Sequence, residues 1–137
     1  TCVCCINPTS PFLQSSDLVK AYSLYSSTSQ DRLVFSSTDY KYPVQRAFTT
    51  DDSGHTKMLF PDLFLKRSQD CDSVFHDAGQ FYFAPPHVWV PNTNLLDGAV
   101  PFHIPHWRVI DIDTLDDWLY AELCFPAIMS RISSQGN

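Results

Sequence analysis

Two apolar runs separated by a segment of helical periodicity occupy the first third of the chain, and this order restricts the fold more than any other feature. Residues 1–6 form an apolar run that predicts a buried strand, and Pro8 and Pro11 then require a loop. Residues 15–29 carry apolar side chains at helical spacing, and residues 32–38 have the composition of a second short strand. This order is typical of a right-handed βαβ unit with parallel strands.

The ends of these elements predict a helix start and a binding loop. Ser15 or Ser16 is expected to cap the helix, with Asp17 in its first turn. Ligands of α/β proteins bind outside the carboxyl ends of the parallel strands. The loop from Asn7 to Pro11 follows the first strand and is therefore a candidate binding site.

The middle of the chain departs from this pattern. Residues 39–48 are extended and aromatic, residues 51–54 are a turn signal, and residues 55–60 have the composition of a returning hairpin strand. We therefore expect an excursion from the parallel sheet over about residues 40–65. Residues 75–83 begin polar and end as a strand, and a short element at 87–90 and an irregular connection over 95–105 follow. The last expected elements are a strand at about 107–112 and a helix at about 115–125 that Pro126 limits. Residues 130–137 are expected to be a frayed tail.

Composition and charge narrow the possible partners. The chain has 137 residues, 44% of them hydrophobic, which is enough for one domain with a core. Its net charge of -6 comes without any basic run, so a nucleic-acid or anionic-membrane partner is not expected. No apolar stretch approaches the roughly 20 residues that span a bilayer, and no signal peptide is recognisable. We therefore expect a soluble, cytoplasmic protein.

The cysteines do not form a metal-binding pattern. Cys2, Cys4 and Cys5 lie in the first apolar run, and we interpret them as reduced thiols of the core. A zinc site would need them together with histidines such as His103 and His106. Because no C-x-x-C pair is present, zinc is the weaker interpretation.

Two aspartates near the end of the chain are the strongest candidates for metal chemistry. In the string R-V-I-D-I-D at residues 108–113, the alternation of a strand would place Asp111 and Asp113 on one face. Their spacing would be roughly 6.5 to 7 Å at about 3.3 Å per residue, so both carboxylates could reach one hydrated divalent cation. Carboxylate oxygens are the ligands that Mg²⁺ prefers.

A structural interpretation of the same residues stands beside this one. The string T-L-D-D at residues 114–117 has the form of a helix start, with Thr114 as the cap and Asp117 in the first turn. Asp113 would then belong to the capping region, and Asp111 would be an ordinary solvated residue. D-x-D-T also occurs in haloacid-dehalogenase-like phosphatases, but there the motif opens the fold. Only 24 residues, 137 minus 113, follow Asp113 here, so a nucleotidyl or glycosyl transferase is expected instead.

Five ordered strings resemble one known family, the acylneuraminate cytidylyltransferases and above all their pseudaminic acid branch. Together they span most of the chain. The strings are N-P-T-S-P at 7–11, Y-P-V-Q-R-A-F at 42–48, R-S-Q-D at 67–70, H-D-A-G-Q-F-Y at 76–82 and R-V-I-D-I-D-T-L-D-D-W at 108–118.

The resemblance implies an α/β, mononucleotide-binding three-layer fold, like that of nucleotide-diphospho-sugar transferases, with a mixed, mainly parallel sheet. It also implies a homodimer and a reaction in which a nine-carbon sugar acid attacks the α-phosphate of CTP and expels pyrophosphate, with Mg²⁺ as the cofactor. Residues 1–129 would be the C-terminal part of such a domain, with residues 40–65 as its dimerisation region. The family's N-terminal L-x-x-R-x-G-S-K loop, which holds the CTP phosphates, has no counterpart here.

The resemblance also implies roles for individual residues. Asp111 and Asp113 would hold Mg²⁺, and arginines would bind the sugar carboxylate through paired hydrogen bonds. Surface positions for the arginines and a structural role for His76 are the alternatives. The implied set comprises the catalytic Asp111, Asp113 and Arg67, with Asn7, Thr9, Ser10, Gln45, Arg46, Gln69, His76, Asp77, Gly79, Gln80 and Tyr82 binding substrates.

The sequence departs from the family pattern at three positions. Asn7 stands where many relatives have Gln or another residue, Phe83 replaces a frequent Trp, and Ile110 replaces a frequent Gln. The choice of sugar is therefore open. A non-catalytic module that keeps the fold without the phosphate-binding loop is the competing hypothesis.

Overall fold

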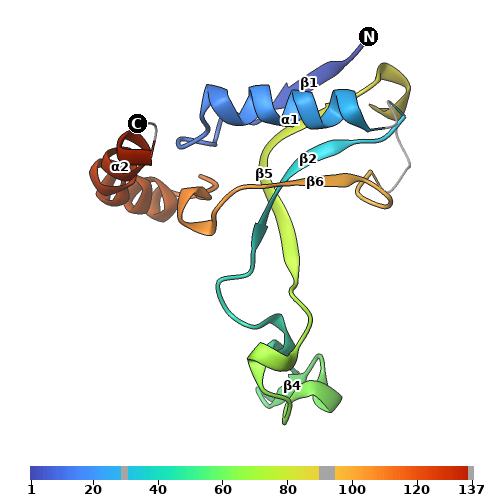
Figure 1. Ribbon diagram of the computed structural model, residues 1–137. Helices are drawn as coiled ribbons and strands as arrows, with labels where there is room; N and C mark the ends of the chain where they lie inside the picture. Colours follow the sequence, from blue (N-terminus) through green and yellow to red (C-terminus); the bar gives the residue numbers. More distant parts are fainter. Residues whose placement is uncertain (29–30, 90–94, 136–137) are drawn as a thin grey trace. The chain divides into compact units, whose positions relative to one another are not determined.

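The computed structural model describes residues 1–28, 31–89 and 95–135 (Figure 1). The chain divides into two compact units. Thr1–Thr38 and Asp77–Asn137 form the first, here called the sheet unit, and Asp39–His76 form the second, here called the excursion unit. The expected α/β class is confirmed, with two α-helices and a mixed sheet.

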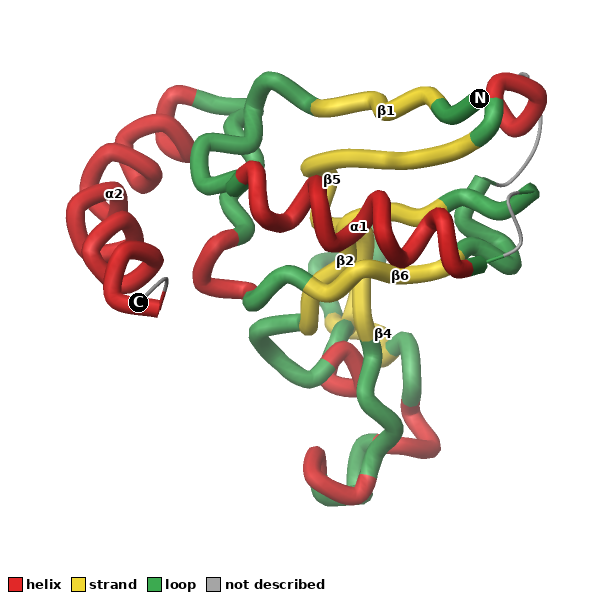
Figure 2. The backbone as a smooth tube through the Cα atoms, turned by 45° about the horizontal axis from the view of Figure 1, so that its top comes forward, coloured by secondary structure: helices red, strands yellow, loops and turns green. Residues whose placement is uncertain are grey.

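Four strands form the main sheet in the order β1-β5-β2-β6 (Figures 1 and 2). Strand β1 pairs antiparallel with β5, with Val3 opposite Ala84, and β2 pairs parallel with β6, with Val34 opposite Val100. The sheet is mostly antiparallel. The strands are β1 (Val3–Ile6), β2 (Val34–Asp39), β5 (Phe75–Ala84) and β6 (Val100–His103).

The expectation of a mainly parallel sheet is therefore wrong. The two strands of the expected βαβ unit, β1 and β2, are both present, but β5 lies between them and they do not pair. Apolar periodicity identifies a strand from its own residues, whereas its hydrogen-bonding partner depends on which distant segment fits beside it. The sequence marked β5 as a strand without indicating its place.

The first strand is exposed, in contrast to the buried strand that its apolar residues predict. All four residues of β1, which is an edge strand of this sheet, are exposed. The cysteines are free, as expected, and the half-buried Cys2 packs against the core, but Cys4 and Cys5 are exposed, so their assignment to the core is wrong.

Helix α1 (Ser15–Ser27) closely matches its predicted range, but its cap differs. Gln14, and neither of the two serines, is the cap residue. The Gln14 backbone N–H donates to Asp17 Oδ2 at 3.1 Å, which forms half of a capping box with Asp17 in the first turn, as expected. A glutamine is an uncommon cap residue, so the preference for serine misled the prediction.

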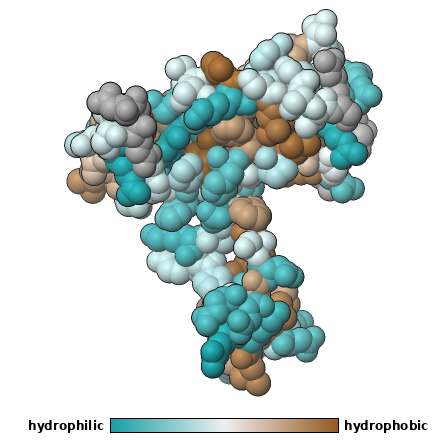
Figure 3. Space-filling view, viewed as in Figure 1, coloured by the Kyte–Doolittle hydropathy of each residue, from teal (hydrophilic) through white to brown (hydrophobic). Residues whose placement is uncertain are grey.

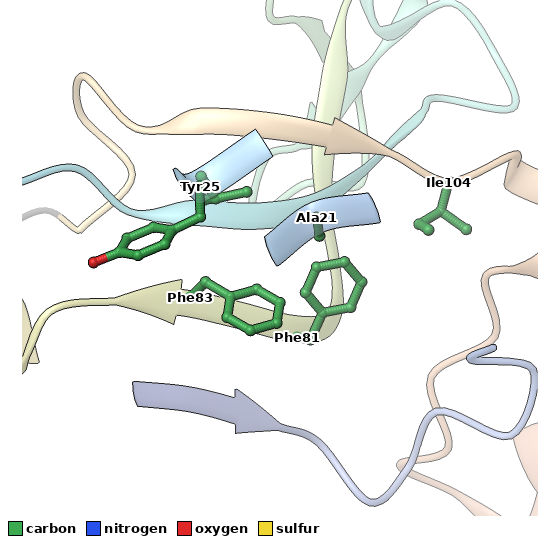
Figure 4. Close-up of a cluster of buried hydrophobic side chains, with 6 residues drawn as sticks. Ala21, Tyr25, Phe81, Phe83 and Ile104 are labelled. Carbon is green, nitrogen blue, oxygen red and sulfur yellow. The ribbon is translucent and has the colours of Figure 1, made fainter. Parts of the chain in front are cut away.

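The core lies between α1 and one face of the sheet (Figure 4). Ala21 and Tyr25 of α1 meet Phe81 and Phe83 of β5, and Phe81 is completely buried. Because side chains alternate along a strand, the neighbours of these residues point to the opposite face. There a second, smaller cluster contains Leu33, Phe35 and Ala84.

The segment after this core was predicted incorrectly. Strand β6 lies within residues 95–105, where an irregular connection was expected. Its Pro101 is tolerated because β6 is at the edge of the sheet, where one side of the strand needs no partner. The expected strand at 107–112 is replaced by a 3₁₀ helix, η5 (His106–Arg108), and by residues 109–114 without regular structure.

Helix α2 (Leu115–Gln135) is longer than predicted and contains Pro126 in its interior. A proline ends a helix only if neighbouring interactions cannot offset the lost hydrogen bond. Residues 130–135, for which the sequence predicts a frayed tail, are helical, and residues 136 and 137 lie outside the described part. Several apolar residues of α2, such as Leu123, are exposed. Among the described residues, no helix is long and apolar enough to cross a membrane.

The excursion unit contains the expected hairpin. Strand β3 (Phe48–Thr50) pairs antiparallel with β4 (Thr56–Met58). Asp51 Oδ1 accepts hydrogen bonds from the backbone N–H of Ser53 and His55, at 2.9 Å each, and Gly54 has a φ of 80° that suits the turn.

Three 3₁₀ helices complete the excursion unit, at Val44–Arg46, Pro61–Leu63 and Ser68–Asp70. Several of its large apolar side chains are exposed, and brown atoms in Figure 3 show how apolar residues reach the surface of the protein. The unit therefore has little core of its own.

Candidate functional site

The loop after β1 is hydrogen-bonded to β5 at Gly79. Asn7 Nδ2 donates a hydrogen bond to the carbonyl oxygen of Gly79 at 2.7 Å, and the Asn7 backbone N–H donates to the carbonyl oxygen of Gln80 at 2.9 Å. Ser10 Oγ lies 3.5 Å from the same Gly79 oxygen. Thus the predicted loop residues and the predicted H-D-A-G-Q string come together.

Gly79 allows a carboxylate to approach the backbone closely. Its φ is 66°, in the left-handed region that glycine adopts without strain. The Gly79 N–H donates to Asp77 Oδ1 at 2.9 Å. A Cβ added to Gly79 would lie 3.5 Å from Asp111 Oδ2, so the side chain of Asp111 lies directly over this glycine.

Tyr82 is a neutral hydrogen-bond donor beside these acids. Its hydroxyl donates to Asp77 Oδ2 at 2.7 Å. Burial, this hydrogen bond and the negative charges of Asp77 and Asp111 all raise the pKa of Tyr82 above its usual value. The phenol therefore stays protonated throughout the physiological range and orients Asp77.

Gln80, for which the resemblance implies substrate binding, lies inside the protein. It is 1% exposed, and its Nε2 donates to the carbonyl oxygen of Arg108 at 3.0 Å. The Gln80 backbone N–H donates to Ser36 Oγ on β2 at 2.9 Å. Gln80 thus ties β5 to β2 and to the segment before Asp111 from inside the protein.

The helix start that the sequence predicts at Thr114 is confirmed. Thr114 Oγ1 accepts a hydrogen bond from the Asp117 N–H at 3.2 Å, and the Thr114 N–H donates to Asp117 Oδ2 at 2.8 Å. Hydrogen bonds from the Thr114 hydroxyl and then from backbone N–H groups lower the pKa of Asp117.

Asp113 remains outside this capping box. Only its backbone N–H takes part, donating to Asp117 Oδ2 at 3.3 Å, and the residue is exposed. The helix start therefore does not occupy the Asp113 carboxylate. However, residues 109–114 do not form the strand that was expected to direct Asp111 and Asp113 to the same side.

Asp111 and Asp113 offer carboxylate oxygens of the kind that Mg²⁺ prefers, without enclosing an ion by themselves. Among the described residues there is no group of three or more His, Cys, Asp or Glu side chains that could enclose a metal. Mg²⁺ commonly keeps several waters and is bound by one or two carboxylates together with substrate phosphates. Asp111 and Asp113 are exposed and have the correct donor atoms for this kind of site.

In the excursion unit, two predicted residues line one cleft. Gln45 and Gln69 border a cleft of about 300 Å³ that also includes Tyr40, Lys41 and Asp72. Gln45 is mostly buried, and its Nε2 lies 3.4 Å from the Asp72 carbonyl oxygen. These amides are thus positioned around a polar cavity.

The remaining predicted residues of this unit have other surroundings. Arg46 lies over the ring of Phe64, 5.0 Å from its centroid, and donates to the carbonyl oxygens of Phe64 and Lys66. Arg67 is exposed just before a 3₁₀ helix, and the His76 ring lies 4.8 Å from the Tyr40 ring. Arg46 therefore has a structural task, whereas the exposed Arg67 guanidinium is accessible to a ligand.

Two features near the acids were missed by sequence reasoning. Arg108 forms an ion pair with Asp17, although the sequence had placed Asp17 only in a helix start. An apolar cleft of about 440 Å³ also borders the loop after β1 and the segment before α2, with Pro11, Ile112 and Trp118 among its lining residues. The R-V-I-D-I-D string contained Arg108, but nothing in it indicated a partner 91 residues away.

Comparison with known proteins agrees with the resemblance of the strings. The chain is 32% identical to pseudaminic acid cytidylyltransferases of two Campylobacter jejuni subsp. jejuni serotypes, O:23/36 and O:2. Each match covers 124 residues, or 90% of this chain and 53% of the relative. The chain is related to the pseudaminic acid cytidylyltransferases. It spans about half the length of these relatives, and no protein-family model matches it.

A matched pair of glycines tests the contact between Gly79 and Asp111. Gly79→Ala and Gly54→Ala both place an alanine at positive φ, so each is expected to lower the free energy of unfolding by about 1 to 2 kcal/mol. A Cβ at Gly54 would meet nothing within 4 Å. In ¹⁵N-HSQC spectra, only Gly79→Ala should shift the Asp111 amide. An unchanged Asp111 signal in that variant would refute the contact.

The capping box gives a prediction about acidity. Thr114→Ala removes the hydroxyl that hydrogen bonds to Asp117, so the pKa of Asp117 should rise towards its usual value. Because its folded-state pKa is lowered, Asp117 contributes stability that is fully present above its unfolded-state pKa and is lost as the pH falls through its folded-state pKa. Between these two pKa values, the Thr114→Ala variant should therefore lose less free energy of unfolding on acidification than the wild type. NMR titration of Asp117 measures the pKa, with Ser130→Ala, an exposed site on the same helix, as the control.

Proposed function

We propose that the protein carrying this chain transfers CMP from CTP to a nonulosonic acid, with pseudaminic acid as the first candidate. The observation that carries this proposal is the 32% identity over 90% of the chain to two pseudaminic acid cytidylyltransferases. The arrangement of Asp111 over Gly79, beside the loop that contains Asn7 and Ser10, supports it. The competing idea of a non-catalytic module is not favoured by this similarity.

In the proposed reaction, the anomeric hydroxyl oxygen of the sugar acid forms a bond to the α-phosphorus of CTP. The bond from that phosphorus to the oxygen of the leaving pyrophosphate breaks, and the hydroxyl proton is released. Phosphoryl and nucleotidyl transfers depend mostly on positioning and on the stabilisation of negative charge. Mg²⁺ bound by Asp111 and Asp113 would supply that charge stabilisation at the phosphates.

The chain's own groups suit the positioning part of this work. Asn7, Thr9 and Ser10 form a loop of small polar residues that can meet the nucleotide and the sugar. Tyr82 and Asp77 form a fixed donor and acceptor pair, 2.7 Å apart, that can orient a sugar hydroxyl. In the excursion unit, we propose that Arg67 and the amides of Gln45 and Gln69 bind the sugar carboxylate and hydroxyls.

For the complete protein we further propose the three-layer mononucleotide-binding fold, a cytoplasmic location and a homodimer.

The dimer proposal rests on exposed apolar residues of the excursion unit. Phe48 is 56% exposed, Phe64 49% and Leu65 92%. Exposed apolar groups gathered on one small unit are typical of an interaction surface.

Sedimentation analysis tests the homodimer. The protein is expected to sediment as a dimer at micromolar concentration, and Leu65→Asp should shift it towards monomer because a charge would be buried in the interface. Asp62→Asn, an exposed change in the same unit, is the control. A wild-type protein that remains monomeric would contradict the proposal.

Pyrophosphate release tests the enzyme and the role of Asp113 together. With CTP, Mg²⁺ and pseudaminic or N-acetylneuraminic acid, the wild type should release pyrophosphate. Asp113→Asn should reduce the rate at least about 100-fold while the urea unfolding curve stays nearly unchanged. Asp116→Asn, an exposed acid in the first turn of α2, should retain activity.

Two results would count against these assignments. If the wild type released no pyrophosphate with any nonulosonic acid, the proposed activity would be wrong. If Asp113→Asn destabilised the protein but kept its activity, Asp113 would have only a structural task.

A further inference from the structure

A nearly buried ion pair connects the start of α1 to the segment that leads to the acids. The Arg108 guanidinium pairs with Asp17 through both carboxylate oxygens, with Nη1 3.3 Å from Oδ1. The two side chains are only 12% and 9% exposed. A second bond from Nη2 reaches the carbonyl oxygen of Phe12 at 3.4 Å. Because this guanidinium is enclosed and its Nη1 and Nη2 are bonded within the protein, it is not placed to contact a substrate.

The backbone of the same arginine is attached to the sheet. The carbonyl oxygen of Arg108 accepts the hydrogen bond from Gln80 Nε2, and the Gln80 N–H is bonded to Ser36 on β2. Arg108 therefore joins α1, the loop before it and β5 at one residue. It lies three positions before Asp111 and five before Asp113.

The residues between Arg108 and the helix cap have few other restraints. Val109 is bonded to His106, and Asp113 to Asp117. In the described part of the chain, no hydrogen bond to another residue holds Ile110, Asp111 or Ile112, and these residues belong to no helix or strand. Apart from the packing of Val109 against the core, the hydrogen bonds that restrain this segment lie at its two ends, at Arg108 and at the Thr114 capping box.

We propose that Arg108 and Asp17 are positioning residues that hold Asp111 over Gly79 and so place the proposed metal-binding acids. The proposal rests on the proposed function for its consequence in catalysis, but its structural content can be measured separately. The pair itself need not stabilise the fold, because the cost of burying two charges offsets much of their attraction. Its effect is on the geometry of the segment that follows. Groups that hydrogen-bond to metal ligands typically change metal affinity or activity 10- to 100-fold when replaced. Arg108 would act on Asp111 through the backbone between them, so the effect is expected at the lower end, about tenfold.

The test compares variants that keep the fold. The double variant Asp17→Leu with Arg108→Met removes both charges, so that no unpaired charge is left buried. Arg108→Lys keeps the charge but loses the two-pronged geometry. Arg32→Met is the control, because Arg32 also links distant segments, through a 2.9 Å bond to the Gly98 carbonyl oxygen, but belongs to no part of the proposed site. Urea unfolding confirms that each variant is folded.

Two measurements besides activity decide the question. The ¹⁵N order parameters of the amides at 110–113 should fall below about 0.6 in the double variant, with those of α1 and β5 unchanged. The Kd for Mn²⁺, measured by electron paramagnetic resonance, should rise about tenfold or more. Arg108→Lys should lie between the wild type and the double variant in both. In the pyrophosphate assay, the KM for Mg²⁺ should rise more than kcat falls.

The possible outcomes separate this inference from the proposed function. If the order parameters at 110–113 and the Mn²⁺ affinity match those of Arg32→Met, the positioning role is refuted, whatever the activity. If the wild type releases no pyrophosphate but the double variant has lower order parameters at 110–113, the positioning role stands and the proposed reaction is wrong. If the double variant unfolds, the order parameters and Mn²⁺ affinity of Arg108→Lys decide in the same way.

Discussion

The placement of β5 between β1 and β2 is the constraint on which the sheet unit depends. One face of this strand provides Phe81 and Phe83 to the core beneath α1, and its polar first half provides Asp77 and Gly79 to the candidate site. Its pairing with β1 brings the Asn7 loop to Gly79. The same strand thus stabilises the fold by apolar burial and assembles the polar groups at one end of the sheet.

The acidic segment illustrates how a short motif can serve two purposes at once. Thr114 and Asp117 form the helix cap, which was the structural interpretation of D-I-D-T-L-D-D. Asp111 lies over Gly79, and the Asp113 side chain is not part of the cap, which leaves the functional interpretation possible. The two interpretations are compatible because they use different residues. The cap also fixes the end of the segment that carries the acids.

Local signals predicted most of the regular elements. Residues 15–27 have clear helical periodicity, and the D-D-S-G turn predicted the hairpin of β3 and β4. The predictions failed at two prolines, because whether a strand or a helix can contain a proline depends on the surrounding structure. Pro101 is accepted at a sheet edge and Pro126 within α2, although both residues normally interrupt such elements. Gly79 was expected only among the substrate-binding residues, and its partner Asp111 was not foreseen.

The sequence by itself determined the α/β class, the helix starts near Asp17 and Thr114, and the family to which the five strings are similar, because these depend on neighbouring residues and on motif order. Only the tertiary structure decided that β1 and β2 are separated by β5, that Gln80 is internal, and that Arg108 pairs with Asp17. Each of these contacts joins segments far apart in the chain. The free energy of such a contact depends on packing and desolvation at a site that no local pattern describes.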